Sequence, residues 1–124
     1  MANENTVANT ATFVGLSSYI GCNASIVPQA DATKANATQL DYGITYLANS
    51  LADDDSVLLP PAKARAMCVI INGDSAQDIQ VFGQGTDTIN DVATATGIAQ
   101  GQKTVLILTC PYDGAWYGTP GTAW

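Results

Sequence analysis

Residues 66 to 82 hold two apolar runs joined by a short polar segment, the strongest hydrophobic pattern in the chain. The first run, Met67 to Ile71, is unbroken and β-favouring, which is typical of a strand buried on both faces or of a central sandwich strand. In the second run Ile79 and Val81 alternate with polar residues, as in a strand with one dry and one wet face. Because Asn72-Gly73 accepts the positive φ angles of tight turns, we expect an antiparallel pair of strands.

Further β-favouring segments, separated by turn signals, continue along the chain. The stretch from Ala37 to Leu51 fits both a strand and one face of a helix, but Gly43 and the Ile-Thr-Tyr triplet after it favour a strand through Tyr46. Ile89 is expected to pin the loop over residues 83 to 91 to the core. The other expected strands are Ser56 to Leu59, Ala93 to Ala99, Lys103 to Cys110 and Ala115 to Tyr117.

This spacing of strands predicts an all-β fold, a small antiparallel β-sandwich or barrel-like domain with an extended N-terminal arm. We assign residues 1 to 36 to the arm and residues 37 to 124 to the β domain. The first 36 residues are rich in Ala, Asn, Thr and Ser and contain one apolar island, Phe13 to Ile20. An arm that orders against a neighbour has this composition. A mobile tail with one edge strand, or the first strand of the sandwich, fits it as well.

The net charge of the chain limits the classes of partner that it can bind. Eleven acidic residues against four basic ones give a net charge of -7. Such a surface repels phosphate, so we expect no direct nucleic-acid binding, and Lys63 with Arg65 is a poor basic cluster. No apolar run approaches the roughly 20 residues that span a bilayer, and the first residues lack the pattern of a secretion signal, so we expect no membrane partner. A protein is the expected partner.

The side chains that usually hold metals are scarce. The chain has no histidine, and Cys22, Cys68 and Cys110 lack the spacing of a zinc site, so we expect no metal and no cofactor. Cys68 and Cys110 lie in or at the end of apolar strands, where free thiols commonly pack as small hydrophobes; a disulfide between them is the alternative. The run Asp53-Asp54-Asp55 lacks a calcium-loop pattern and is expected to be a solvated turn.

Known catalytic motifs are missing as well, so we expect no enzyme. Asp74 and Asp78 flank the expected turn, and such a carboxylate pair could serve a glycosidase. Their preference for turns explains them more simply, because aspartate bonds to its own backbone there.

An ordered series of short motifs gives the first indication of function. They are TQL at 38 to 40, SVLLPPA at 56 to 62, MCVIIN at 67 to 72, DIQVF at 78 to 82, GTDTIND at 85 to 91, GQKTVLIL at 101 to 108 and AWY at 115 to 117. This order resembles small virion proteins of tailed bacteriophages, in which similar strands, a TIN loop and a late Trp follow one another. The resemblance covers about residues 38 to 117.

The resemblance implies a viral structural protein, either a capsid decoration (cement) protein on the outer surface of the phage head or a module of a head or tail fibre. A cement protein would bind the major capsid protein and form a homo-oligomer, with a trimer matching a threefold lattice site. The expected partner-binding residues are Phe13, Leu16, Tyr19 and Ile20, because an arm that orders on binding needs apolar and aromatic anchors.

A fibre module would instead bind a host-surface carbohydrate or receptor. Trp116, Tyr117 and Trp124 are the aromatic residues that would stack on a sugar. Trp116 is expected to lie in the core, because an aromatic residue late in the chain completes the packing of a small sandwich.

Overall fold

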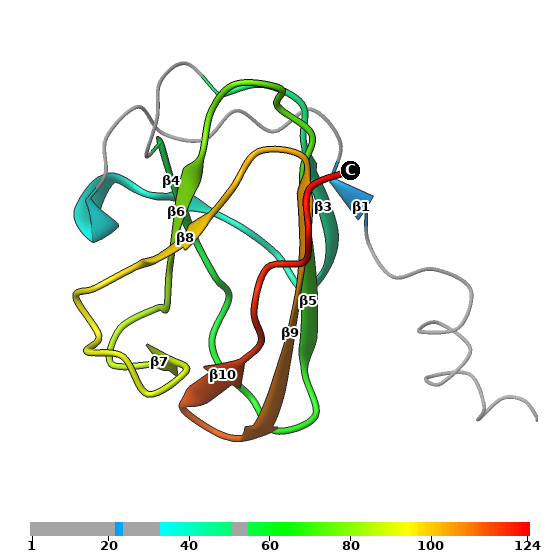
Figure 1. The fold of residues 1–124 in the computed structure, drawn as a ribbon. Coiled ribbons are helices and arrows are strands. Elements are labelled where there is room, and N and C mark those ends of the chain that lie inside the picture. The colour runs from blue at the N-terminus through cyan, green and yellow to red at the C-terminus, as the bar shows by residue number, and fades with distance from the viewer. Residues whose placement is uncertain (1–21, 24–32, 51–54) are drawn as a thin grey trace, which may run out of the picture.

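A computed structural model describes residues 22–23, 33–50 and 55–124 of the 124-residue chain. Within these residues the only helix is a three-residue 3-10 turn, and all other regular structure is β (Figure 1). The fold is therefore all-β, as the sequence predicts. The elements are β1 (Cys22–Asn23), η1 (Lys34–Asn36), β2 (Thr38–Gln39), β3 (Gly43–Leu47), β4 (Asp55–Leu58), β5 (Met67–Asn72), β6 (Ile79–Phe82), β7 (Thr88–Ile89), β8 (Ile98–Gln100), β9 (Thr104–Tyr112) and β10 (Ala115–Tyr117).

The strands form two mixed sheets. One has the order β1-β3-β5-β9-β10-β7 and the other the order β2-β4-β6-β8. From β2 to β6 each strand lies in the opposite sheet from the one before it, so that β1, β3 and β5 run parallel in one sheet and β2, β4 and β6 run parallel in the other. Antiparallel pairing joins β5 to β9, β9 to β10 and β6 to β8. The expectation of antiparallel sheets is therefore wrong.

The predicted hairpin of β5 and β6 is also wrong, since the two strands lie in different sheets. Neither Asn72 nor Gly73 has positive φ. Gly73 instead continues the pairing with β3, donating its N–H to the Leu47 carbonyl at 2.9 Å. Asn72 is buried and its Nδ2 donates to the carbonyls of Gln77, at 3.0 Å, and Gly101, at 3.2 Å. The Asn72 side chain therefore fixes a path that crosses to the other sheet.

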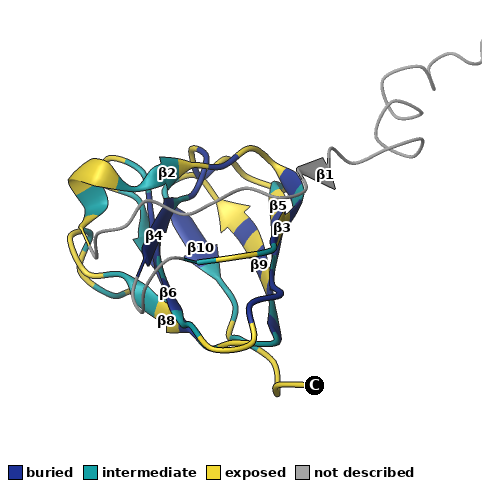
Figure 2. Cartoon of the chain, turned by 90° about the horizontal axis from the view of Figure 1, so that it is seen from above, coloured by how far each residue is buried: buried dark blue, intermediate teal, exposed yellow. Residues whose placement is uncertain are grey.

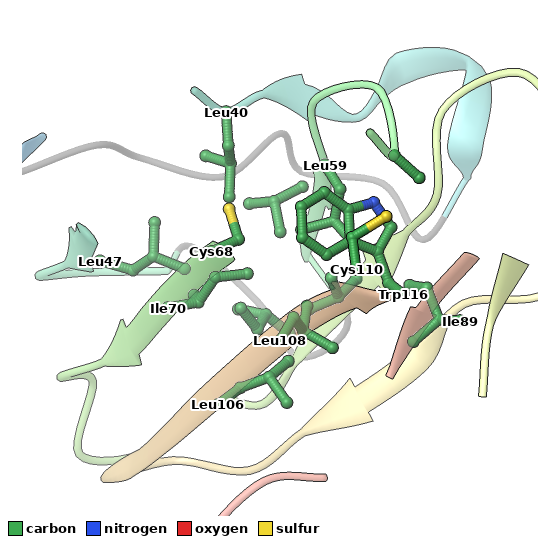
Figure 3. Packing of buried hydrophobic residues seen from close by; sticks show 14 residues of the cluster. Leu40, Leu47, Leu59, Cys68, Ile70, Ile89, Leu106, Leu108, Cys110 and Trp116 are labelled. Atoms are coloured by element: carbon green, nitrogen blue, oxygen red, sulfur yellow. The ribbon is translucent and has the colours of Figure 1, made fainter. Parts of the chain in front are cut away.

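Both sheets carry buried positions (Figure 2), and their apolar side chains form one core (Figure 3). The inward positions of β5 and β9 alternate with outward ones, as the pleat of a strand requires. Trp116 on β10 is fully buried, as predicted, and is among the largest core side chains (Figure 3). Ile89 is buried too, which confirms that it pins its loop. Core members include Leu47, Val57, Leu59, Ile70, Ile79, Val81, Leu106 and Leu108.

The two cysteines of this core are free and buried, so the expectation of packed thiols is confirmed and no bond joins them. Burial, with a smaller contribution from Asp41, raises the pKa of Cys68 to about 12. Asp55 was expected in a solvated turn, but it is buried at the start of β4, where Oδ2 accepts a hydrogen bond from the Ser50 hydroxyl at 2.9 Å. Of the expected strand over residues 93 to 99, only the end is confirmed, as β8.

No helix in the described ranges is long and apolar enough to cross a membrane.

Neighbouring positions on β9 provide a stability test. Leu106→Ala leaves a cavity in the core and is expected to lower the free energy of unfolding by about 2–5 kcal/mol. Ile107→Ala removes a side chain that is 53% exposed and is expected to cost about 0.5 kcal/mol or less. Urea denaturation of both variants measures the difference. Equal losses would show that the two faces of β9 have been assigned wrongly.

Candidate functional site

The outward face of β3, β5 and β9 is apolar although it is not covered by any other described segment. These three strands contain no Asp, Glu, Lys or Arg, although the chain carries a net charge of -7. Burial alternates along β9, so that every second side chain points away from the core (Figure 2). We call this surface the outer sheet face. Its members are Ile44, Tyr46, Met67, Val69, Ile71, Val105, Ile107 and Thr109.

Register arranges these side chains in rows across the strands. Ile44 is paired with Val69, and Val69 with Ile107. The next row, Tyr46, Ile71 and Val105, is apolar as well. Side chains directly opposite each other on one face of a sheet touch, so the rows form a continuous patch.

The exposure of this patch is unusual. Met67 is 49% exposed and Ile107 is 53% exposed. A sheet with one face in solvent normally has apolar side chains on its buried face and polar side chains on its exposed face. Contiguous apolar patches on a protein surface commonly mark binding sites. The chemistry of the outer sheet face therefore suits binding of a protein segment.

One end of the outer sheet face carries a cation and an aromatic ring. Lys103 Nζ donates to the Gly73 carbonyl at 2.7 Å and lies 5.8 Å from the centroid of the Trp124 ring, which is 64% exposed. The Tyr46 ring lies so close to Gly73 that a Cβ there would clash with it. A side chain at position 73 would therefore displace the Tyr46 ring from this end of the face.

Asp74 stabilises the loop beside Lys103. Its Oδ1 accepts backbone N–H bonds from Ala76, at 2.8 Å, and Gln77, at 3.0 Å, and its Oδ2 accepts one from Ser50 at 2.8 Å. Burial alone would raise the pKa of Asp74, but these three donors and the positive charge of Lys103 outweigh it and lower the pKa. Asp74 thus has the turn-forming role that the sequence predicts.

Asp78 also accepts a backbone bond, from the Gln102 N–H at 3.0 Å. Within the part of the chain that the structure describes, no group of three or more His, Cys, Asp or Glu residues could hold a metal ion.

The opposite end of the outer sheet face carries two tyrosines and a carboxylate. The Tyr112 and Tyr117 hydroxyls lie 2.7 Å apart, and the Tyr117 hydroxyl donates to Asp91 Oδ1 at 2.8 Å. The hydrogen bonds with Tyr112 and with Asp91 raise the pKa of Tyr117 well above its usual range. The two rings meet edge to face with centroids 6.2 Å apart. Tyr112 is 55% exposed and presents its ring to solvent.

The C-terminal segment, residues 118 to 124, runs beside β9 from one end of the outer sheet face to the other. Gly121 donates its N–H to the Val105 carbonyl at 2.8 Å, and Trp124 donates to the Lys103 carbonyl at 2.9 Å. Asn90 fixes the start of this segment, because its side-chain amide both donates to the Gly118 carbonyl and accepts from the Gly118 N–H at 3.0 Å. The loop over residues 83 to 91 therefore positions the C-terminal segment through Asn90 and contributes Ile89 to the core.

The partner-binding residues expected from the sequence, Phe13, Leu16, Tyr19 and Ile20, lie outside the described residues. β1 begins two residues after Ile20 and pairs with β3, so the apolar island directly precedes the edge of the sheet that carries the outer sheet face. Of the three aromatics expected to stack on a sugar, Trp116 is buried and does not serve that role.

Sequence reasoning did not identify the outer sheet face itself. The strands were expected, but an apolar run has the same appearance whether one or both of its faces are covered. The only signal in the sequence is that Val69, Ile71, Val105 and Ile107 interleave with the core positions without any charged residue.

Asp74→Asn is expected to lower the free energy of unfolding by about 1–2 kcal/mol near pH 7, because three hydrogen bonds lose a charged acceptor. The pKa of Asp74 in the folded protein lies below its value of 3.8 in the unfolded chain. The stabilisation by the ionised carboxylate is therefore complete above pH 3.8 and is lost as the pH falls through the folded-state pKa. Denaturation of both proteins between pH 7 and pH 2 measures this. A difference that is constant over the whole range would contradict the assignment.

Comparison with known proteins adds no family. No protein-family model matches the chain, and no curated protein matches it. The resemblance to phage virion proteins therefore depends on the order of short motifs, and a function has to be argued from the outer sheet face and the residues beside it.

Proposed function

We propose that the chain is a structural protein of a tailed-phage particle, a decoration protein that binds the major capsid protein on the outer surface of the assembled head and stabilises it. The two sheets act as a small sandwich, and residues 1 to 36 supply an arm in which Phe13, Leu16, Tyr19 and Ile20 contact the partner. A homotrimer matches a threefold site on the capsid lattice.

The observation that supports this proposal best is the charge-free outer sheet face. A strongly acidic surface repels other acidic surfaces, and the absence of charged side chains on β3, β5 and β9 means that an acidic partner would meet no carboxylate on these strands. Apolar surface with aromatic anchors provides most of the binding energy in protein interfaces. A protein that must adhere to a larger assembly needs such a side and no catalytic group.

The acidic groups elsewhere fit the same function. A particle coated with many copies remains soluble when its outside carries net charge, and a charge of -7 per chain supplies it. Asp41 and Asp113 are exposed in the structure. With the apolar side turned toward the capsid, the charged loops face solvent.

Binding to undecorated capsids of the phage that encodes the chain tests the proposal. The full-length protein is expected to bind saturably at many copies per particle. A full-length variant with Phe13→Ser, Leu16→Ser, Tyr19→Ser and Ile20→Ser is expected to bind at least about a hundredfold more weakly, a loss of about 2.7 kcal/mol, because the aromatic anchors are gone. Sedimentation and densitometry measure the copies bound per capsid, which give the saturation level of the full-length protein and the loss of binding in the variant.

Point substitutions are better suited to this test than deletion of residues 1 to 36. β1 pairs with β3, and Lys34 Nζ donates to the Thr94 carbonyl at 2.9 Å, so a deletion would also remove parts of the domain. Val7→Ser, which changes an apolar residue outside the island, serves as the control and is expected to bind normally. Failure of the unaltered protein to bind would refute the decoration function.

The cluster of Tyr112, Tyr117 and Asp91 favours a second candidate, a fibre module that binds a carbohydrate. Exposed aromatic rings stack on the apolar faces of sugars, and a carboxylate beside them accepts hydroxyl hydrogen bonds. On a glycan array this function predicts binding that Tyr112→Ala abolishes and that Tyr42→Ala, an exposed tyrosine elsewhere, leaves unchanged. An array without any bound glycan would exclude it for the sugars tested.

A further inference from the structure

The two ends of the outer sheet face carry opposite charges, and this polarity describes a partner. We infer that the face binds an extended protein segment that is uncharged in its middle, with a carboxylate at the Lys103 end and an ammonium or guanidinium group at the Asp91 end. That the segment belongs to the major capsid protein rests on the proposed function. The match of charges can be tested without capsids.

The middle of the face offers only apolar contacts. Its central rows contain Val69 with Ile107 and Ile71 with Val105, and Ile107 is 53% exposed. Because β3, β5 and β9 carry no charged side chain, a charged residue in the middle of a partner segment would lose water without gaining a counter-charge. The middle of the segment is therefore uncharged.

Lys103 provides a fixed cation at one end. It directly precedes β9, and its Nζ donates to the Gly73 carbonyl at 2.7 Å beside the Trp124 ring. An ammonium group has three N–H donors, and this is the one hydrogen bond of Nζ within the described residues. Asp74 feels the charge of Lys103, but three backbone N–H groups already bind its carboxylate. Lys103 thus has donors left for a carboxylate of a partner.

Asp91 provides an anion at the other end. Thr109 pairs with Met67 on one side and with Tyr117 on the other, so Tyr117 extends the last row of the face. The Tyr117 hydroxyl donates to Asp91 Oδ1 at 2.8 Å. In the part of the chain that the structure describes, Oδ2 has no such bond. A carboxylate oxygen of this kind accepts strong hydrogen bonds from an ammonium or guanidinium group.

The separation of the two ends sets the length of the segment. Lys103 and Thr109 are six residues apart, which is about 20 Å along an antiparallel strand. Outward side chains of β9 repeat every second residue, about 6.8 Å, and an extended segment has the same repeat. Side chains on one face of a helix repeat at about 4.5–6 Å and do not keep this register. Seven extended residues span the face, with the first and seventh at the charges and the third and fifth on the apolar rows.

The net charge of the chain makes a preference for an acidic end diagnostic. At a charge of -7, general electrostatic attraction favours a cationic segment and opposes a carboxylate. A segment with one acidic and one basic end binds more tightly than the same segment with two basic ends only where a local cation meets the carboxylate. Lys103 is the cation at this face.

Three synthetic peptides test the inference by calorimetry with the full-length protein at low salt. The matched probe is acetyl-Asp-Thr-Val-Thr-Ile-Thr-Lys-amide. The double-lysine probe has Lys in place of its Asp, and the double-aspartate probe has Asp in place of its Lys. The protein is expected to bind the matched probe about threefold more tightly than either of the others, a factor typical of one exposed ion pair.

Neutral variants assign each preference to one end of the face. Lys103→Gln keeps a donor for the Gly73 carbonyl and is expected to abolish the preference over the double-lysine probe. Lys103→Arg is expected to retain it, as is Lys63→Gln, which removes an exposed cation elsewhere. Asp91→Asn keeps an acceptor for the Tyr117 hydroxyl and is expected to abolish the preference over the double-aspartate probe. If urea denaturation shows that Lys103→Gln does not fold, Asp91→Asn carries the test.

Tighter binding of the double-lysine probe by the unaltered protein would overturn the inference, because the net charge alone would then explain the binding. Self-association that Ile107→Lys abolishes would overturn it as well, because a second copy would then occupy the face. The capsid experiment remains separate. If the probes bind as expected and the unaltered protein does not bind capsids, the decoration function fails and the charge match stands. If the protein binds capsids and the probes show no preference, the charge match fails.

Discussion

The antiparallel pairing of β5 with β9 fixes both the order of the larger sheet and the two faces of its central strands. It joins six consecutive residue pairs, from Met67 with Thr109 to Asn72 with Thr104. Through this pairing the parallel strands β1, β3 and β5 are connected to β10 and β7 in a single sheet. The register also decides which side chains enter the core and which face outward, so both the core and the outer sheet face follow from it.

Polar side chains hold the crossings between the sheets. Gln100 is buried on β8, and its Nε2 donates to the Ile70 carbonyl at 2.9 Å and to the Thr104 carbonyl at 3.1 Å, which ties the four-stranded sheet to β5 and to the start of β9. Asn72 makes the reverse connection to the Gln100 carbonyl at 3.3 Å. Buried amides are costly unless they are bonded, so these contacts specify one path for the chain.

Local patterns predicted the strands but could not predict their partners. The apolar runs at β5 and β9, the buried Trp116 and the pinning Ile89 follow from residue type and period alone. The hairpin expected at Asn72-Gly73 is wrong because a turn signal concerns only neighbouring residues, whereas the Asn72 side chain bonds to the Gln77 carbonyl and, at long range, to the carbonyls of Gln100 and Gly101. The outer sheet face was missed for a related reason, since periodicity cannot show which buried-looking side chains lack a neighbour.

If the outer sheet face serves binding rather than folding, a charge placed on it should weaken binding and leave the stability of the fold nearly unchanged. Ile107→Lys places an ammonium group in the middle of the face. We predict that capsid binding weakens about tenfold or more, since the charge would have to be desolvated, while the free energy of unfolding changes by less than about 1 kcal/mol. Ala99→Lys on the other sheet should change neither. Unchanged capsid binding by a folded Ile107→Lys protein would show that the outer sheet face does not contact the capsid.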